Sequence, residues 1–181
     1  MARPPHARER VLDAFEKLLL SDGERAATLD AVARAAGVSK GGLLYHFASK
    51  DELAGAMIER LTRLVADDVA QMNSAAEGAV EYYLRTSVMM GDALDRAIIA
   101  VSRMAQGGSD AAIAALHRMR EDSAAAIRPH VRDQAALDLV MLLSDGLFFN
   151  NTLDADGSEA VVPSGAGLDA LVALVLRCTR D

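Results

Sequence analysis

Apolar residues recur three and four positions apart along most of the chain, and this spacing places them on one face of an α-helix. Helix-breaking prolines are rare, since after Pro5 only Pro129 and Pro163 occur. The pattern therefore predicts an all-α protein of about nine helices. We expect these helices at residues 7–21, 29–36, 40–47, 50–72, 75–89, 92–105, 109–127, 133–151 and 167–179.

The second and third predicted helices are joined by a very short turn. Thr28 and Ser39 stand where N-caps are needed, because a side-chain oxygen there can accept a backbone N–H from the first helical turn. Gly37 can adopt the left-handed conformation that often ends a helix. Two helices with so short a connection must cross at a steep angle, as in a helix-turn-helix.

The third predicted helix lies in the stretch SKGGLLYHF, residues 39–47. On a helical wheel Leu43, Leu44 and Phe47 share a sector, and we expect them to face the core. Each glycine in a helix costs about 0.8–1 kcal/mol relative to alanine, so the two glycines here need a reason. Without side chains, the backbone can approach an anionic partner closely at the helix start. The sector opposite the core consists of Gly41, Gly42, Tyr45 and His46, with Lys40 in the exposed first turn.

Charge is distributed unevenly along the chain. The formal net charge is −7, yet residues 1–55 carry as many basic as acidic groups, so the whole excess falls in residues 56–181. We therefore expect a nucleic-acid site in the first part only. Distant acidic groups are screened beyond about 8 Å at physiological salt. The basic groups that would set the local field are Arg3, Arg8, Arg10, Arg25, Lys40 and Lys50.

The last two predicted helices are apolar nearly all round. One stripe of the first contains Leu137, Val140 and Met141, and a second contains Leu139 and Leu142. A helix buried on one side needs only one stripe, so we expect one face to pack inward and the other against a second copy of the chain. Two core helices of a monomer are the alternative.

The middle helices favour methionine, a side chain that adapts to irregular space and to ligands of varied shape. Plain core packing explains many of these methionines. The sharper hypothesis is a largely apolar pocket for a small molecule. Its candidate residues are Tyr82, Tyr83, Met89, Met104, His117, Met141, Phe148 and Phe149, with Asp145 or Asn150 as a polar anchor.

Several other classes of protein are not supported. GAGLDA at residues 165–170 lacks the preceding strand of a dinucleotide-binding turn, and no acid-base or nucleophile set indicates an enzyme. His117 and His130 are not at metal-ligand spacing, so no metal or cofactor is expected. The single cysteine, Cys178, excludes an intramolecular disulfide and is expected to be buried. Without a membrane span or signal peptide we expect a cytoplasmic protein.

The stretch TLDAVARAAGVSKGGLLYHFASKDELAGAMIERL, residues 28–61, closely resembles the helix-turn-helix signature of the TetR family of transcriptional regulators. The resemblance implies a DNA-binding domain at residues 1–50 and a helical ligand-binding and dimerisation domain at residues 51–181, with a homodimer built on the last two helices. One departure is Leu44, where the family often has an aromatic residue. By motif position, the implied DNA-binding residues are Thr28, Ser39, Lys40, Gly41, Gly42, Tyr45, His46 and Lys50.

We accordingly expect a ligand-responsive regulator that binds a pseudo-palindromic double-stranded DNA operator. Most members of the family are repressors, and release by a small, largely apolar molecule is the expected response. An activator of the same fold remains open. A helical adaptor or ligand-binding protein that does not bind DNA is the alternative from a different class.

Overall fold

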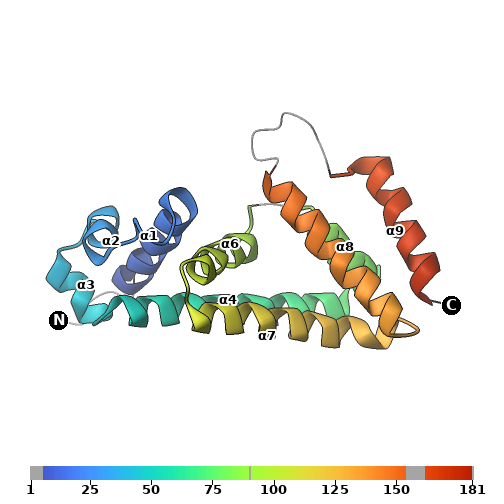
Figure 1. The fold of residues 1–181 in the computed structure, drawn as a ribbon, viewed down its shortest axis with the longest axis horizontal. Coiled ribbons are helices and arrows are strands. Elements are labelled where there is room, and N and C mark those ends of the chain that lie inside the picture. The colour runs from blue at the N-terminus through green and yellow to red at the C-terminus, as the bar shows by residue number, and fades with distance from the viewer. Residues whose placement is uncertain (1–5, 90, 154–161, 181) are drawn as a thin grey trace. The chain divides into compact units, whose positions relative to one another are not determined.

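The computed structural model describes residues 6–89, 91–153 and 162–180 (Figure 1). Within these ranges the chain is all-α, as predicted, without a strand. The elements are α1 (His6–Asp22), α2 (Leu29–Ala35), α3 (Lys40–His46), α4 (Lys50–Ser74), α5 (Ala79–Thr86), α6 (Ala93–Gln106), α7 (Asp110–Ile127), the 3-10 helix η1 (Arg128–His130), α8 (Gln134–Leu153) and α9 (Gly165–Arg180).

The largest difference from the predicted elements is α5, which is expected at residues 75–89 and is shorter at both ends. Gly78 has a φ of 93°, which breaks the helical path just before the first residue of α5. A long irregular segment is expected at residues 154–167, and α9 instead begins at Gly165. Residues 154–161 of that segment, and Arg3, lie outside the described residues.

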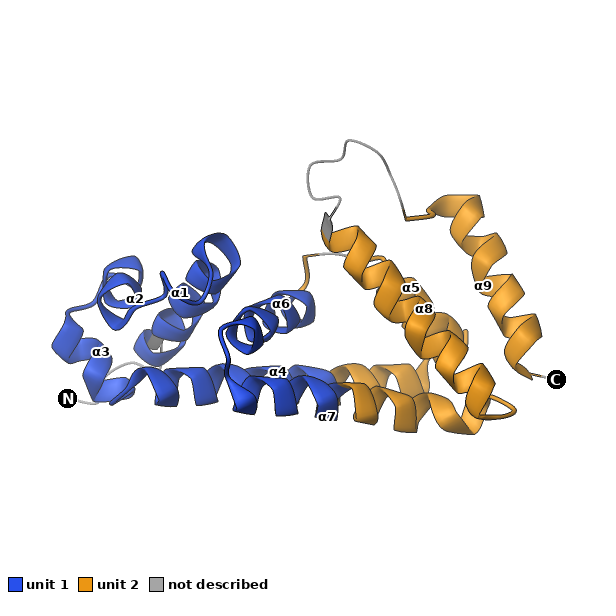
Figure 2. Cartoon of the chain, in the orientation of Figure 1, with its two compact units in different colours: residues 1–65, 93–119 blue, residues 66–92, 120–181 orange. Residues whose placement is uncertain are grey.

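The chain forms two compact units (Figure 2). Unit 1 comprises Met1–Val65 and Ala93–Met119, and unit 2 comprises Ala66–Asp92 and Arg120–Asp181. Helices α4 and α7 each continue from one unit into the other. This division describes packing and does not test the functional boundary expected between residues 50 and 51, which stays a prediction.

Unit 1 is built around α1, which packs against α2, α3 and α6. Val11 and Phe15 of α1 are fully buried, as are Leu43 of α3 and Leu53 of α4. Burying a side chain of this size contributes about 1.5–3 kcal/mol. The short helices α2 and α3 are therefore held mainly by this core, since isolated helices of their length are unstable in water.

In unit 2, α5, α8 and α9 pack against one another. Their shared core includes Leu84, Leu137, Val140 and Val172. The predicted inward stripe of α8 is confirmed. No helix in the described ranges has both the length and the apolar character needed to cross a membrane.

The expectation that Cys178 is buried is wrong, because its side chain is exposed. The buried stripe of α9 runs through Leu168, Val172, Val175 and Thr179. Position 178 lies beside this stripe, so the apolar residues next to it in the sequence did not indicate that it is buried.

Candidate nucleic-acid interface

Helices α2 and α3 form a helix-turn-helix whose caps are the predicted ones. The Thr28 hydroxyl oxygen accepts the backbone N–H of Ala31 at 3.2 Å, and the Ser39 hydroxyl oxygen accepts that of Gly42 at 3.0 Å. Between the helices, Gly37 has a φ of 67°, in the left-handed region. Local sequence chemistry therefore fixes where both helices begin and how the chain turns between them.

Helix α3 has one buried stripe and one exposed face. Leu43 and Phe47, four residues apart, are 0% and 2% exposed. The expectation that Leu44 also faces the core is wrong, because its side chain is 39% exposed. Leu44 lies about 100° around the helix from Leu43, and the narrow core contact does not reach that far. The exposed residues of the helix are Lys40, Gly41, Leu44 and Tyr45.

The two glycines of α3 differ in their surroundings. A Cβ atom at Gly41 would have no neighbour within 4 Å, so this glycine presents bare backbone to the solvent. A Cβ atom at Gly42 would lie 3.2 Å from the Ser39 hydroxyl oxygen, so Gly42 also makes room for the helix cap. Only Gly41 is an open position on the exposed face.

Tyr45 and His46 are the last two residues of this helix. Tyr45 is 73% exposed, whereas His46 is half-buried. Their rings meet edge to face with centroids 5.3 Å apart. Tyr45 thus extends from the helix as its largest exposed side chain, and His46 supports it from the side.

The two lysines among the expected DNA-binding residues are paired with carboxylates. Lys40 Nζ lies 3.0 Å from an Asp30 carboxylate oxygen, and both side chains are more than half exposed. Lys50 Nζ lies 2.5 Å from a Glu24 carboxylate oxygen and donates to the Glu24 carbonyl at 3.0 Å. An exposed pair contributes only about 0.2–1 kcal/mol, so a phosphate can displace Asp30 from Lys40.

The start of α4 is occupied by its own side chains. The Ser49 hydroxyl oxygen accepts the Glu52 N–H at 3.1 Å, and the Glu52 carboxylate accepts the Ala48 N–H at 2.8 Å. This is close to a capping box. Two N–H groups at this helix start are therefore already bonded within the chain.

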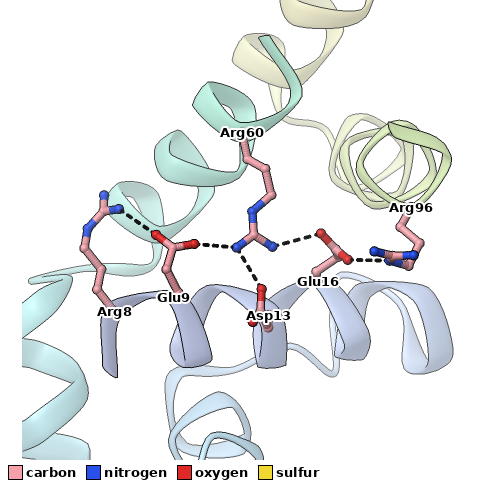
Figure 3. Close-up of polar contacts among 6 residues, drawn as sticks. All are labelled: Arg8, Glu9, Asp13, Glu16, Arg60 and Arg96. Carbon is pink, nitrogen blue, oxygen red and sulfur yellow. Dashed lines mark hydrogen bonds and ion pairs between the residues drawn. The ribbon is translucent and has the colours of Figure 1, made fainter. Parts of the chain in front are cut away.

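An ion-pair network within unit 1 holds α1 against α4 and α6 (Figure 3). Arg60 of α4 contacts Glu9 and Asp13 at 2.8 Å and Glu16 at 3.0 Å. The second carboxylate oxygen of Glu16 lies 3.1 Å from Nε of Arg96 in α6. Glu16 and Arg60 have side chains only 10% and 11% exposed. These ion pairs thus help to fix the orientation of α1 relative to α4 and α6.

Burial lowers the pKa of the Arg60 guanidinium, but the hydrogen bonds that it donates to Asp13, Glu9 and Glu16 outweigh this and leave the pKa raised. Arg60 therefore carries its charge throughout the pH range in which the protein folds. Sequence reasoning missed this network. Its members are 44 and 80 residues apart along the chain, beyond the reach of helical periodicity.

Arg8 lies at the same end of α1 as α3. Its guanidinium carbon is 4.8 Å from the centre of the Phe47 ring, a cation–π contact, and it also pairs with Glu9 at 3.8 Å. Its side chain is 45% exposed. A cation therefore remains accessible next to the C-terminal end of α3.

The residues expected to contact a small molecule are divided between the units. Met104 and His117 belong to unit 1 and the others to unit 2. In unit 2, Tyr82, Tyr83 and Met141 pack in or against the same core cluster. Phe148 is half-buried, and the Asn150 amide donates to the Gly146 carbonyl of its own helix. The exposed members of the set are Met89, His117, Asp145 and Phe149.

A buried hydroxyl cluster accompanies these residues in unit 2. The hydroxyl oxygens of Ser87 and Ser144 are 2.6 Å apart. Burial raises the pKa of the Tyr83 phenol, and hydrogen bonds with Ser144 and Ser123 partly oppose that rise. The sequence contains one signal for this cluster, since Ser144 lies on the otherwise apolar inward stripe of α8.

Asp145 pairs with Arg120 in unit 2. Both side chains are 40% or more exposed. The aspartate among apolar neighbours thus has an arginine partner in this structure.

Comparison with known families and structures agrees with this geometry. Residues 11–57 match the family model described as bacterial regulatory proteins, tetR family. This range runs from α1 through the helix-turn-helix into α4. No curated protein sequence gives a significant match.

Solved structures match over nearly the whole chain. A transcriptional regulator from Rhodococcus sp. Rha1 is 22% identical with a TM-score of 0.67, covering 96% of this chain and 98% of that one. The multidrug binding protein EbrR, solved with imidazole, is 19% identical with a TM-score of 0.62 and coverages of 97% and 91%. NalD of Pseudomonas aeruginosa, the secondary repressor of the MexAB-OprM multidrug efflux pump, is 19% identical with a TM-score of 0.59 and coverages of 97% and 96%.

The expected fold, an N-terminal helix-turn-helix domain followed by a helical C-terminal domain, is confirmed by these matches. At this level of identity the structures show the fold, and the match of residues 11–57 shows the kind of N-terminal domain. Residues 11–57, with their capped helix-turn-helix, thus form an N-terminal domain of the kind found in bacterial regulatory proteins of the tetR family.

Proposed function

We propose that this protein is a ligand-responsive repressor that binds an operator as a homodimer and is released by a small, largely apolar molecule. The observation that carries the proposal is the exposed face of α3, where Gly41 offers bare backbone beside the exposed Tyr45. Such a face has no role in the core of unit 1. A helix-turn-helix usually binds DNA by inserting its second helix, here α3, into the major groove.

The proposed contacts with DNA divide into two groups. Lys40, Gly41, Gly42 and Tyr45 would face the major groove, and Lys40, in the first turn of α3, would meet a phosphate that borders the groove. The other residues that would hold phosphates are Thr28, Ser39, His46 and Lys50. Both lysines would exchange their carboxylate partners for phosphate oxygens, which makes the affinity depend on salt.

A dimer is proposed because one such domain makes few phosphate contacts. Helix α8 supports it with the exposed apolar side chains of Leu139, Leu142 and Phe149, and α9 with Leu174. These helices already bury their inward stripes in unit 2, so the exposed positions form a second apolar face. Two copies joined there would present two α3 helices to successive turns of a pseudo-palindromic operator.

The effector is proposed to bind in unit 2, around Tyr83 and Met141. An apolar molecule would find packing there, and the hydroxyls of Ser87 and Ser144 would hold a polar group. EbrR, which binds multiple drugs, and NalD, a repressor, have the same fold and support a ligand-responsive repressor over an activator. A coupling free energy of about 1–3 kcal/mol would lower operator affinity about 5- to 150-fold.

In the experiment, the full-length protein selects duplexes at low salt from a random library and from the DNA upstream of its own gene. We expect pseudo-palindromic duplexes whose half-sites are about one helical turn apart. A compound screen should then find molecules that release them. If the protein shifts no duplex even at low salt, it is a helical adaptor rather than a regulator that acts on DNA.

A further inference from the structure

Helix α3 concentrates the exposed apolar surface of the DNA-binding region. Among residues 6–65, the large hydrophobic side chains that are exposed are Leu44 and Tyr45, at 39% and 73%. They are neighbours in sequence: Tyr45 lies opposite the buried Leu43 and Phe47, and Leu44 lies on the flank between Tyr45 and that buried stripe. A single exposed leucine is ordinary, but this one stands on the helix proposed to enter the major groove.

The same face is poor in groups that read bases by hydrogen bonds. Its exposed residues are Lys40, Gly41, Leu44 and Tyr45, and of these only Lys40 is a side chain of the kind that commonly bonds two atoms of one base. Lys40 is turned toward Asp30 of α2. Gly41, one turn before Leu44 and Tyr45, leaves open space where a side chain would keep DNA away.

We propose that Leu44 is a specificity-determining residue that reads the 5-methyl group of one thymine in each operator half-site. This inference rests on the proposed DNA-binding function. In the major groove the thymine methyl is the apolar group among the base edges, so it is the complement of an exposed leucine. Gly41 permits the close approach that this contact needs, and Tyr45 extends the apolar surface along the groove.

The test replaces thymine by uracil, a change that removes the methyl group and leaves every hydrogen-bonding atom in place. The probe is a duplex selected from a random library by the full-length protein, synthesised with one thymine at a time changed to uracil. Loss of one buried methyl should weaken binding by the wild-type protein about 4-fold at one symmetric position. Changing both half-sites should weaken it about 15-fold.

Leu44→Ala should abolish this discrimination and bind the thymine and uracil duplexes equally. The matched control is Ile113→Ala, because Ile113 is also 39% exposed and belongs to the same unit but lies on α7. It should discriminate as the wild type does. Thermal unfolding of Leu44→Ala near the wild-type midpoint shows that the domain stays folded.

Two results would overturn the inference while leaving the proposed function intact. In the first, the wild-type protein binds the selected duplex equally well with thymine or uracil at every position. In the second, Leu44→Ala discriminates as strongly as the wild type. Failure to select any duplex would refute the proposed function itself.

Discussion

The ammonium nitrogen of Lys40, the first residue of α3, lies 3.0 Å from a carboxylate oxygen of Asp30 in α2. The acidic partner comes from the other helix of the same helix-turn-helix. A phosphate that binds Lys40 must therefore compete with a carboxylate that the protein itself supplies.

Asp30→Asn should strengthen DNA binding about 1.5- to 5-fold per half-site, because it removes an exposed ion pair that competes with phosphate. Lys40→Ala should weaken binding to all sequences alike and reduce the salt dependence by about one counterion per protomer. Titration of a labelled duplex at several salt concentrations measures both effects. Glu59→Gln, which changes the net charge equally at an exposed position of α4, is the control and should leave the affinity near that of the wild type. Equal gains from both acidic substitutions would mean that only the total charge matters.

Gly41→Leu should weaken operator binding at least 10-fold and leave the helical content unchanged, since its Cβ atom has open space in the free protein. Gly42→Leu is a less clean test, because its Cβ atom would also press on the Ser39 cap. Gly55→Leu in α4 has equally open surroundings and serves as the control. Circular dichroism and gel-shift titration provide the readouts. Wild-type affinity in Gly41→Leu would exclude close backbone approach at this position.

Glu16→Gln should destabilise unit 1 by about 1.5–3 kcal/mol, because it weakens the charge-assisted bonds to Arg60 and Arg96. Asp13→Asn removes another carboxylate from Arg60, but its side chain is 64% exposed, so it should cost less than about 1 kcal/mol. Urea unfolding of both variants measures the difference. Similar losses in the two variants would contradict a central role for Glu16.

Leu142→Glu should convert the proposed dimer to monomer, since it places a charge on the exposed apolar face of α8, where Leu142 is 65% exposed. Sedimentation at micromolar concentration measures the mass, and gel-shift titration should show a parallel loss of affinity. Ile113→Glu, an equivalent change on α7, should remain dimeric. A wild-type protein that sediments as a monomer would exclude the dimer directly.

Asp68→Asn should stabilise the protein at neutral pH. Burial raises the pKa of Asp68, and its hydrogen bond from the Tyr82 hydroxyl at 2.8 Å offsets this only in part. A raised carboxyl pKa means that the folded state holds the proton more tightly than the unfolded state, so this group's contribution to stability falls as pH rises through the folded pKa. The thermal midpoint of Asp68→Asn should therefore exceed that of the wild type at pH 7, and the gap should narrow toward pH 4. If the difference in thermal midpoint between the two proteins does not change with pH, the effect comes from packing rather than from ionisation.

The sequence predicted the helices and caps well, because the chemistry that sets them is local. Thr28 and Ser39 cap helices within three residues of themselves, and Gly37 turns the chain at a single position. Leu44 was assigned to the wrong face because the width of the buried stripe depends on neighbouring helices. The wheel gives the angle between positions and does not give the breadth of the contact.

The remaining misses depend on contacts between distant segments. Arg60 meets Glu16 across 44 residues, and no periodic pattern marks either residue as a partner. The candidate effector residues share an apolar or aromatic character that core residues share too, so composition could not separate them. Ser144 was not predicted either, although a hydroxyl on an otherwise apolar stripe is a usable signal, since a buried polar group requires a partner.

Helix α3 is seven residues long and contains two glycines, so it cannot persist as a helix by itself. Leu43 and Phe47 hold it in place through the core of unit 1. The surface that would meet DNA is consequently a product of tertiary folding, and an isolated peptide of residues 39–47 would be unstructured. Core variants such as Leu43→Ala would lose DNA affinity without altering any atom that faces the groove. Resistance to unfolding and the proposed affinity for DNA are therefore linked, and selection on one would act on the other.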